Sequence, residues 1–311
     1  MFRKELLSLM SVFLFGISAC AGQTIPRPLP TPFSLNSSPE ALPTQTLLFP
    51  TSTSTSTIPA ATPIPWQERD VIPATISPHM LEVYQRGMEL GNNPHAFSRI
   101  GDGNASAEWF LTDFDRGTSY YNLGGYESLQ ATIDFFHGSF ARKNISAGRG
   151  FNTLIILDPS KADKQLCELN ETPLVCELRI NKPAFALILM GTNQVWRPDE
   201  FEQGMREILE TLIARGVIPV LSTKADNLEG DGRINAVIAA LADEYQVPLW
   251  NFWWALQPLP EHGLQTDNEH ITWAGNDFSD PVNMQNGWPW RNLSALQLLD
   301  MLKKQVVDVA E

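Results

Sequence analysis

Positive charge is scarce in this chain. The 311 residues include 22 Lys and Arg against 35 Asp and Glu, which gives a formal net charge of −13. A groove for nucleic acid needs clustered Lys and Arg, so the charge balance argues against a nucleic-acid partner. It excludes no small-molecule substrate. The length and the 43% hydrophobic content are enough for one large α/β domain with additional segments.

Cysteine is also scarce, with only three residues in the chain. Cys167 and Cys176 lie close together in a domain that we expect to be exported, and this predicts one disulfide between them. Two free thiols are the alternative. No histidine lies near this pair in the sequence, so a metal site is not expected there. No cofactor is predicted.

No apolar run near the N-terminus is long enough to span a bilayer. Residues 6–17 are mostly apolar and follow two basic residues, which is typical of a secretory signal peptide. Residues Ile17–Cys20 (ISAC) resemble the bacterial lipobox, in which the cysteine becomes lipid-modified; an ordinary signal peptide is the alternative. We therefore expect residues 1–19 to be a lipoprotein signal peptide and a diacylated Cys20 to anchor the exported protein to a membrane, at the cell surface or in the periplasm.

Charge almost disappears between Ala21 and Pro65. Pro, Ser and Thr dominate this stretch, and residues 51–57 read TSTSTST. Such a segment has too little apolar surface to offset the entropy that ordering would cost. We expect residues 20–66 to form a disordered tether and residues 67–311 to form the folded domain.

The rest of the sequence alternates apolar strands with amphipathic helices. Its organising segment is the unbroken apolar run 184–190, which lies between Pro183 and Gly191. A short run closed in this way predicts a strand that is buried on both faces, as in a parallel sheet covered by helices. The alternation therefore predicts a doubly wound, three-layer α/β/α sandwich of the flavodoxin-like type. Further strands are expected at 97–100, 139–145, 217–221 and 248–252, and helices are expected after Ser77, at 173–180, after Pro198, at 234–245 and after a cap at Asn292.

Polar and glycine-rich residues follow three of these strand ends, where ligands bind in open parallel sheets. The stretches are 101–104 (GDGN), 148–150 (GRG) and 191–193 (GTN), and a fourth, 267–270 (DNEH), precedes the last helix. An Asp three residues before a His can hold one imidazole nitrogen and leave the other free as a base. Backbone N–H groups at a glycine turn and an Asn amide can stabilise a developing oxyanion.

The order and spacing of the four stretches resemble the SGNH (GDSL-type) hydrolases, from Phe97 to the C-terminus. The resemblance implies ester or acyl hydrolysis on a lipid, an acylated sugar or a cell-wall glycan. It implies roles for these residues: His270 as the base, Asp267 as its orienting acid, Asn193 as an oxyanion donor, and either Gly148 or Gly150 as a second donor.

The first stretch departs from the family at its most important position. Gly103 stands where the nucleophilic Ser belongs, and glycine has no side chain that could attack a carbonyl. Gln194 stands where Asp is usual in the third stretch. Ser106 could substitute as a nucleophile if the loop folds back, or His270 could activate water directly at a lower rate. The alternatives to a hydrolase are a catalytically degenerate module that binds carbohydrate or acyl ligands, and a non-catalytic scaffold.

Tryptophan is concentrated in the final third of the chain, around His270. Packing in the core is the expected role of most of these side chains. Exposed indole faces beside a cleft would instead suit sugar rings. The residues concerned are Trp250, Trp253, Trp254, Trp273, Trp288 and Trp290, and Trp196 follows the Asn193 turn.

An acidic stretch follows the strand expected at 217–221. It contains Asp226, Glu229 and Asp231, and their spacing does not fit a calcium-binding loop. A solvated surface loop is therefore expected.

Overall fold

The structure is a computed structural model that describes residues 64–310. The predicted signal peptide at 1–19, the predicted lipidation site at Cys20 and residues 20–63 of the predicted tether lie outside the described residues. Within residues 64–310, no helix is both long enough and apolar enough to cross a membrane.

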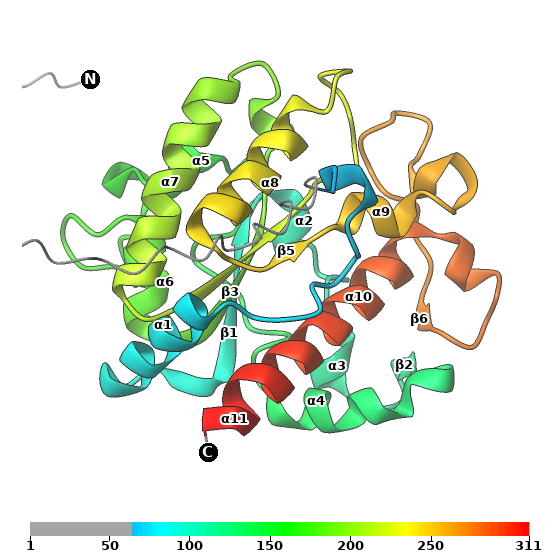
Figure 1. Ribbon diagram of the computed structural model, residues 1–311, viewed down its shortest axis with the longest axis horizontal. Coiled ribbons are helices and arrows are strands. Elements are labelled where there is room, and N and C mark those ends of the chain that lie inside the picture. Colours follow the sequence, from blue (N-terminus) through cyan, green and yellow to red (C-terminus); the bar gives the residue numbers. More distant parts are fainter. Residues whose placement is uncertain (1–63, 311) are drawn as a thin grey trace, which may run out of the picture. The chain divides into compact units, whose positions relative to one another are not determined.

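A parallel sheet of four strands forms the centre of the domain (Figure 1). Its strand order is β1-β3-β4-β5, and every residue of β3 is buried, as the apolar run predicted. A second, two-stranded parallel sheet joins β2 to β6. The strands are β1 (Asn93–Gly101), β2 (Tyr121–Asn122), β3 (Pro183–Leu189), β4 (Ile218–Ser222), β5 (Leu249–Trp250) and β6 (Asn276–Asp277).

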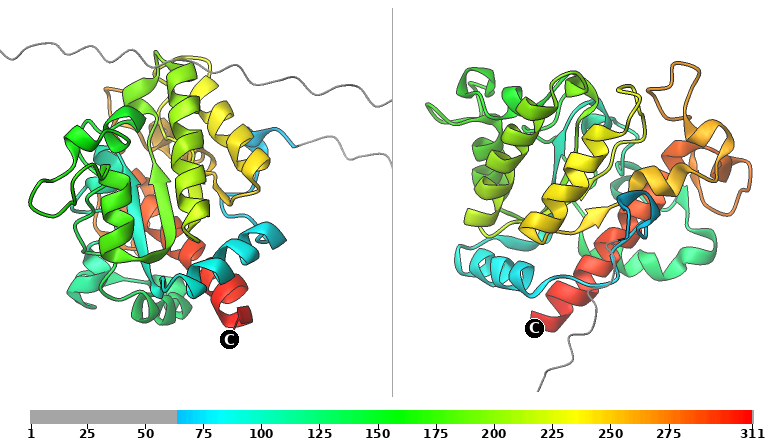
Figure 2. Two further views of the ribbon diagram at one scale, coloured as in Figure 1. Left: turned by 90° about the vertical axis from the view of Figure 1, so that its left-hand side faces the viewer. Right: turned by 45° about the horizontal axis from the view of Figure 1, so that its top comes forward.

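Helices cover both faces of the four-stranded sheet, which confirms the predicted three-layer α/β/α fold. Helices α5 to α8 pack against one another and form one layer. Figure 2 shows strand β5 between α8 of this layer and α10. On the other face, the Tyr84 ring and the Phe136 ring both pack against Phe185 of β3. The longer helices are α1 (Pro78–Glu89), α4 (Gln130–Phe135), α6 (Pro173–Asn181), α7 (Pro198–Ala214), α8 (Arg233–Tyr245) and α10 (Gly287–Leu302). The short ones are α2 (Gly103–Ser106), α3 (Asp113–Arg116), α5 (Thr153–Ile156), α9 (Phe252–Leu256) and α11 (Asp308–Ala310).

The strand expected at 139–145 is absent, because side-chain oxygens from this segment accept the hydrogen bonds of the backbone N–H groups on the outer edge of β1. Asn144 Oδ1 accepts a hydrogen bond from Arg99 N at 2.6 Å, and Ser139 Oγ accepts one from Phe97 N at 3.4 Å. Backbone pairing is limited to a single parallel bridge between Gly101 and Ala147. The apolar pattern of a sequence cannot show that side chains will accept hydrogen bonds which the backbone carbonyls of a neighbouring strand usually accept.

The expected start of the last helix is also wrong. Helix α10 begins at Gly287, and Asn292 is buried within it. The Asn292 amide instead binds the chain that follows α2: its Oδ1 accepts from Leu111 N at 2.9 Å and its Nδ2 donates to Trp109 O at 3.0 Å. By contrast, Ser77 caps α1 as predicted, accepting a hydrogen bond from Met80 N.

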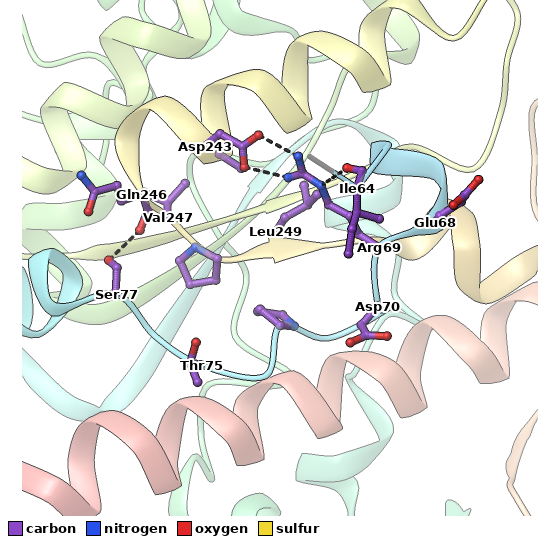
Figure 3. A pocket seen from close by; sticks show the side chains of 13 residues that line it. Ile64, Glu68, Arg69, Asp70, Thr75, Ser77, Asp243, Gln246, Val247 and Leu249 are labelled. Atoms are coloured by element: carbon purple, nitrogen blue, oxygen red, sulfur yellow. Dashed lines mark hydrogen bonds and ion pairs between the residues drawn. The ribbon is translucent and has the colours of Figure 1, made fainter. Parts of the chain in front are cut away.

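The N-terminal arm, residues 64–77, ends β5 sooner than expected. Asn251 N donates to Val71 O at 2.9 Å, so the arm takes over the pairing after only two strand residues. Arg69 makes a bidentate ion pair with Asp243 of α8, and a cavity of about 480 Å³ lies between the arm and α8 (Figure 3). None of the predicted site residues lines this cavity. Trp66 packs edge-on against Trp253, so the contacts of the folded unit extend to residue 66, on the N-terminal side of the boundary expected between residues 66 and 67.

The predicted disulfide is confirmed. Cys167 and Cys176 are bonded, with their Cα atoms 5.2 Å apart. The bond ties the loop that precedes α6 to the helix itself. Because both sulfur atoms are in the disulfide, neither is a free thiol.

Candidate active site

The turn after β1 places Gly103 at the start of α2. Gly101 has a φ of +143°, and a Cβ at this position would lie 1.8 Å from Leu189 O of the neighbouring strand, so only glycine fits. The buried Asp102 side chain then caps α2 by accepting from Asn104 N at 2.9 Å. Gly103 is not among the residues with positive φ, and a Cβ there would meet nothing within 4 Å. The backbone of the nucleophile position is therefore compatible with a side chain.

The turn after β3 carries Asn193 and is fixed by its neighbours. Gly191 has a φ of +132°, and Thr192 Oγ1 donates to Asp226 Oδ2 at 2.7 Å. Asn193 Nδ2 donates to Phe151 O at 2.9 Å, which uses one of its two amide hydrogens. Gln194, at the position where the family has Asp, is buried and makes two hydrogen bonds to Thr153 at the start of α5.

The two candidate glycines of the second stretch have different environments. Gly148 N donates to Gly101 O at 3.1 Å, so this N–H group is already used. Gly150, with a φ of +77°, lines the same cleft as Gly103. Of the two, Gly150 is therefore the one placed to offer a backbone donor to a ligand.

His270 and Asp267 form the pair that their spacing predicted. His270 Nδ1 and Asp267 Oδ2 are 2.8 Å apart, and Asp267 Oδ1 accepts from the backbone N–H groups of Glu269 and His270, both at 3.0 Å. These contacts, the backbone bond from Glu269 first, lower the pKa of Asp267 to about 2. The carboxylate thus stays ionised at physiological pH and orients the ring, which leaves His270 Nε2 to act on a ligand.

One open cleft of about 550 Å³ brings most of the predicted site residues together. Those that line it are Gly103, Ser106, Gly150, Asn193 and His270, and they are joined by Asp102, Asn104, Ala107, Trp109, Arg149, Thr192, Gln265, Glu269, Ile271 and Trp288. Ser106 faces this cleft from α2, but its hydroxyl makes only a long, 3.5 Å bond to Gly103 O and none to His270. The cleft thus brings His270, which is paired with Asp267, together with Asn193, Gly150 and Gly103.

Similar solved structures include several GDSL-type enzymes, whereas no protein-family model and no curated protein matches the chain. One is a GDSL-like lipase from Bacteroides thetaiotaomicron, at 15% identity over 72% of this chain and 99% of that chain, with a TM-score of 0.38. Another is the psychrotrophic esterase EstA from Pseudoalteromonas, at 14% identity over 68% and 97%, with a TM-score of 0.41. A third is an acetylxylan esterase from Geobacillus stearothermophilus, at 14% identity over 66% and 93%, with a TM-score of 0.41. The likeness is one of fold.

Two buried charges lie beneath the cleft. Burial raises the pKa of Asp102 to about 6, although the hydrogen bond from Asn104 and the nearby Arg291 charge oppose the rise. Burial also lowers the pKa of Arg291 to about 10, and its guanidinium lies 4.2 Å from the centre of the Phe252 ring. Within residues 64–310, Arg291 Nε and Nη1 have no hydrogen-bond partner. Arg291 was not predicted as a site residue, although a single Arg in such an apolar segment was a usable signal.

Two of the three acidic side chains after β4 are buried, which corrects the prediction of a solvated loop. Lys224 Nζ lies 2.7 Å from Asp226 Oδ1 and 2.6 Å from Glu229 Oε2, and all three side chains are less than 5% exposed. Of the three acidic residues, only Asp231 is exposed, and it pairs with Arg233. Since Asp226 also accepts from Thr192, this cluster supports the turn that carries Asn193.

Fewer of the tryptophans are buried than expected. Trp250 and Trp288 are buried, whereas Trp196, Trp254 and Trp273 are exposed. Trp109, which was not among the predicted residues, lines the cleft and is 42% exposed. Its place beside the cleft depends on the bond from Asn292 of α10, a contact that has no local sequence signal.

Proposed function

We propose that this domain binds an acylated ligand in the cleft above β1 and β3, and does not form an acyl-enzyme. The observation that carries the proposal is an open cleft with a formed His270–Asp267 pair and with glycine at position 103. A carbonyl oxygen bound there could accept hydrogen bonds from Gly150 N and Asn193 Nδ2. A scaffold that only presents its surface has no need of such an open cleft.

Slow hydrolysis is a second candidate function, and the preserved pair favours it. Asp267 holds Nδ1 of His270, so the ring can take a proton at Nε2 from a water molecule that attacks a bound ester. Without a serine, the attack lacks the advantage of a nucleophile held in place by the protein. Any turnover by this route is therefore expected to be slow.

We further propose that the domain is exported and held at a membrane by a lipid on Cys20. The support for this proposal is the N-terminal sequence: a basic start, a short apolar run and the residues ISAC at 17–20. Residues 20–63 would act as a tether between that anchor and the domain. A domain placed in this way would meet acylated glycans or lipids of the cell envelope.

Three measurements test the proposed function. Calorimetry with an O-acetylated methyl pyranoside is expected to detect binding, and p-nitrophenyl acetate is expected to be hydrolysed slowly. A fluorophosphonate, which labels activated serines, should not label the protein. The His270→Ala variant should lose the residual hydrolysis, whereas His79→Ala, on the surface of α1, should match the natural protein. Labelling of the natural protein at Ser106 would overturn the proposal, as would the absence of any binding.

A further inference from the structure

A second hollow adjoins the cleft and carries exposed tryptophan. Its volume is about 490 Å³. We call it the aromatic shelf and define it by Glu108, Trp109, Asp113, Arg116, Gln265, Trp273 and Trp288. Trp109 is 42% exposed and Trp273 is 63% exposed, whereas Trp288 is buried beneath them. Large apolar rings left in solvent beside a cleft are candidates for ligand contact.

The shelf and the cleft are continuous. Trp109, Gln265 and Trp288 line both of them. A ligand that places an acyl group near Gly103 and His270 could therefore extend over Trp109 and Trp273 without leaving the protein surface.

The shelf is built as a rigid surface. The rings of Trp109 and Trp288 meet edge to face, with their centroids 5.7 Å apart. Asn292 Nδ2 of α10 donates to Trp109 O at 3.0 Å and so fixes the backbone of this residue. A surface that is ordered before binding loses less entropy when a ligand arrives.

We propose that the aromatic shelf binds a neutral oligosaccharide, so that the acylated ligand of the cleft is an acylated glycan. This inference rests on the proposed function. Pyranose rings carry apolar C–H faces that stack on indoles, and their equatorial hydroxyls hydrogen-bond to groups at the rim. The rim supplies those groups as the carboxylates of Glu108 and Asp113, the Arg116 guanidinium and the Gln265 amide.

The charges of the shelf favour a neutral sugar over an anion or a long acyl chain. Two carboxylates stand against one guanidinium, so an anionic headgroup would meet net negative charge. Arg116 lies 3.3 Å from Asp113, whose other oxygen accepts from Asn276 Nδ2 at 2.8 Å. An acyl chain laid across these groups would remove them from water with no hydrogen bonds in return. Sugar hydroxyls replace the lost water contacts.

The test compares a short probe with long ones. The short probe is the O-acetylated methyl pyranoside, which reaches only the cleft. The long probes are tetrasaccharides of xylose, of glucose and of N-acetylglucosamine, with and without O-acetyl groups. Isothermal calorimetry on the natural domain should show at least one tetrasaccharide binding more tightly than the short probe.

Substitutions then locate the contact. Trp273→Ala and Trp109→Ala should each weaken tetrasaccharide binding about tenfold, which corresponds to roughly 1.4 kcal/mol. Trp273→Ala should leave the affinity for the short probe unchanged, because Trp273 lines the shelf and not the cleft, whereas Trp109 lines both. Trp196→Ala, which removes an exposed tryptophan outside the shelf, is the matched control and should change neither affinity. Because Trp273 is the more exposed of the two shelf residues, its variant tests the idea even if Trp109→Ala fails to fold.

The outcomes separate the two proposals. Binding of the short probe without tighter binding of any tetrasaccharide overturns the shelf inference and leaves the proposed function standing. Absence of binding by every probe overturns both. Competition by a dodecanoyl ester that depends on Trp273 would show an acyl-chain site and overturn the carbohydrate assignment.

Discussion

At the scale of single residues, the proposed function depends on the glycine at position 103. Position 103 has an unstrained backbone and open space, and it lines the same cleft as His270, Asn193 and Gly150. Asp267 lies behind His270, to which it is hydrogen-bonded. The glycine is therefore not required by the turn, in contrast to Gly101, where a Cβ would collide with Leu189 O. The turn itself would accept a serine.

Gly103→Ser is expected to raise the hydrolysis of p-nitrophenyl acetate by about two to three orders of magnitude, because it adds a nucleophile to a formed base and acid pair. It should also make the protein react with a fluorophosphonate. The measurement compares initial rates for the natural protein, Gly103→Ser, and Gly103→Ser with His270→Ala. Equal rates for the single and the double variant would show that the gain does not use His270.

Asp102 is expected to make the stability of the fold depend on pH. Its pKa is about 6 in the folded state against 3.8 in the unfolded state, so the folded protein holds this proton more tightly. The stabilisation is complete below pH 3.8 and is lost as the pH rises through about 6, a difference of roughly 3 kcal/mol at most.

Urea unfolding from pH 4 to pH 7 checks this expectation in the natural protein and in Asp102→Asn, which cannot ionise. The natural protein should lose stability relative to the variant as the pH rises. Asp231→Asn is the control, because Asp231 is exposed and its pKa is lowered rather than raised. Parallel pH profiles for the natural protein and Asp102→Asn would contradict the assigned pKa.

At the scale of elements, the loop between β4 and α8 is held by a buried cation. Lys224 is the second residue after β4 and reaches both Asp226 and Glu229, so the loop folds around its ammonium group. Ile234 of α8 also donates its backbone N–H to Glu229 Oε1 at 3.3 Å. The cluster therefore links the end of β4, the start of α8 and, through Thr192, the end of β3.

Lys224→Met is expected to lower the free energy of unfolding by about 3–5 kcal/mol, because it leaves two buried carboxylates without their partner. Lys304→Met is the matched control: Lys304 pairs with Asp300 at the surface, with its side chain 61% exposed, and should cost less than about 1 kcal/mol. Urea unfolding at pH 7 measures both. Equal losses for the two variants would mean that the buried cluster does not stabilise the loop.

At the scale of the whole molecule, the described domain is one folded unit preceded by a long segment of low charge. The arm at 64–77 runs along β5 and α8, where Arg69 pairs with Asp243 (Figure 3). Within the described residues, the arm therefore lies at the β5 edge of the sheet.

Cys20→Ser is expected to release the protein from membranes, since a serine cannot carry the thioether-linked lipid. Cell fractionation with immunoblotting, together with incorporation of labelled palmitate, measures the effect. Ser18→Ala leaves the cysteine in place and should remain in the membrane fraction. A Cys20→Ser protein that still sediments with membranes would exclude lipidation as the anchor.

Much of the fold and part of the candidate site were predictable, because they depend on residues close together in the chain. The run 184–190 predicts a doubly buried strand from composition alone, and the Asp267–His270 spacing predicts a hydrogen bond across three residues. The disulfide is a short-range feature of the same kind. Glycine at position 103 is likewise visible in the sequence, and with it the absence of a side chain there.

Tertiary structure alone decided the features that depend on contacts between distant segments. Asn292 binds the chain at Trp109 instead of capping a helix, and Asn144 replaces the expected strand beside β1. Lys224 and Arg291 became buried charges because helices close over them. The sequence by itself determined the local elements and the residues available for chemistry. Only the packing of the chain decided which side chains are buried and which N–H groups remain free. It also decided that an aromatic shelf adjoins the cleft. Burial and hydrogen bonding depend on neighbours far away in the sequence, and for this reason no local pattern predicts them.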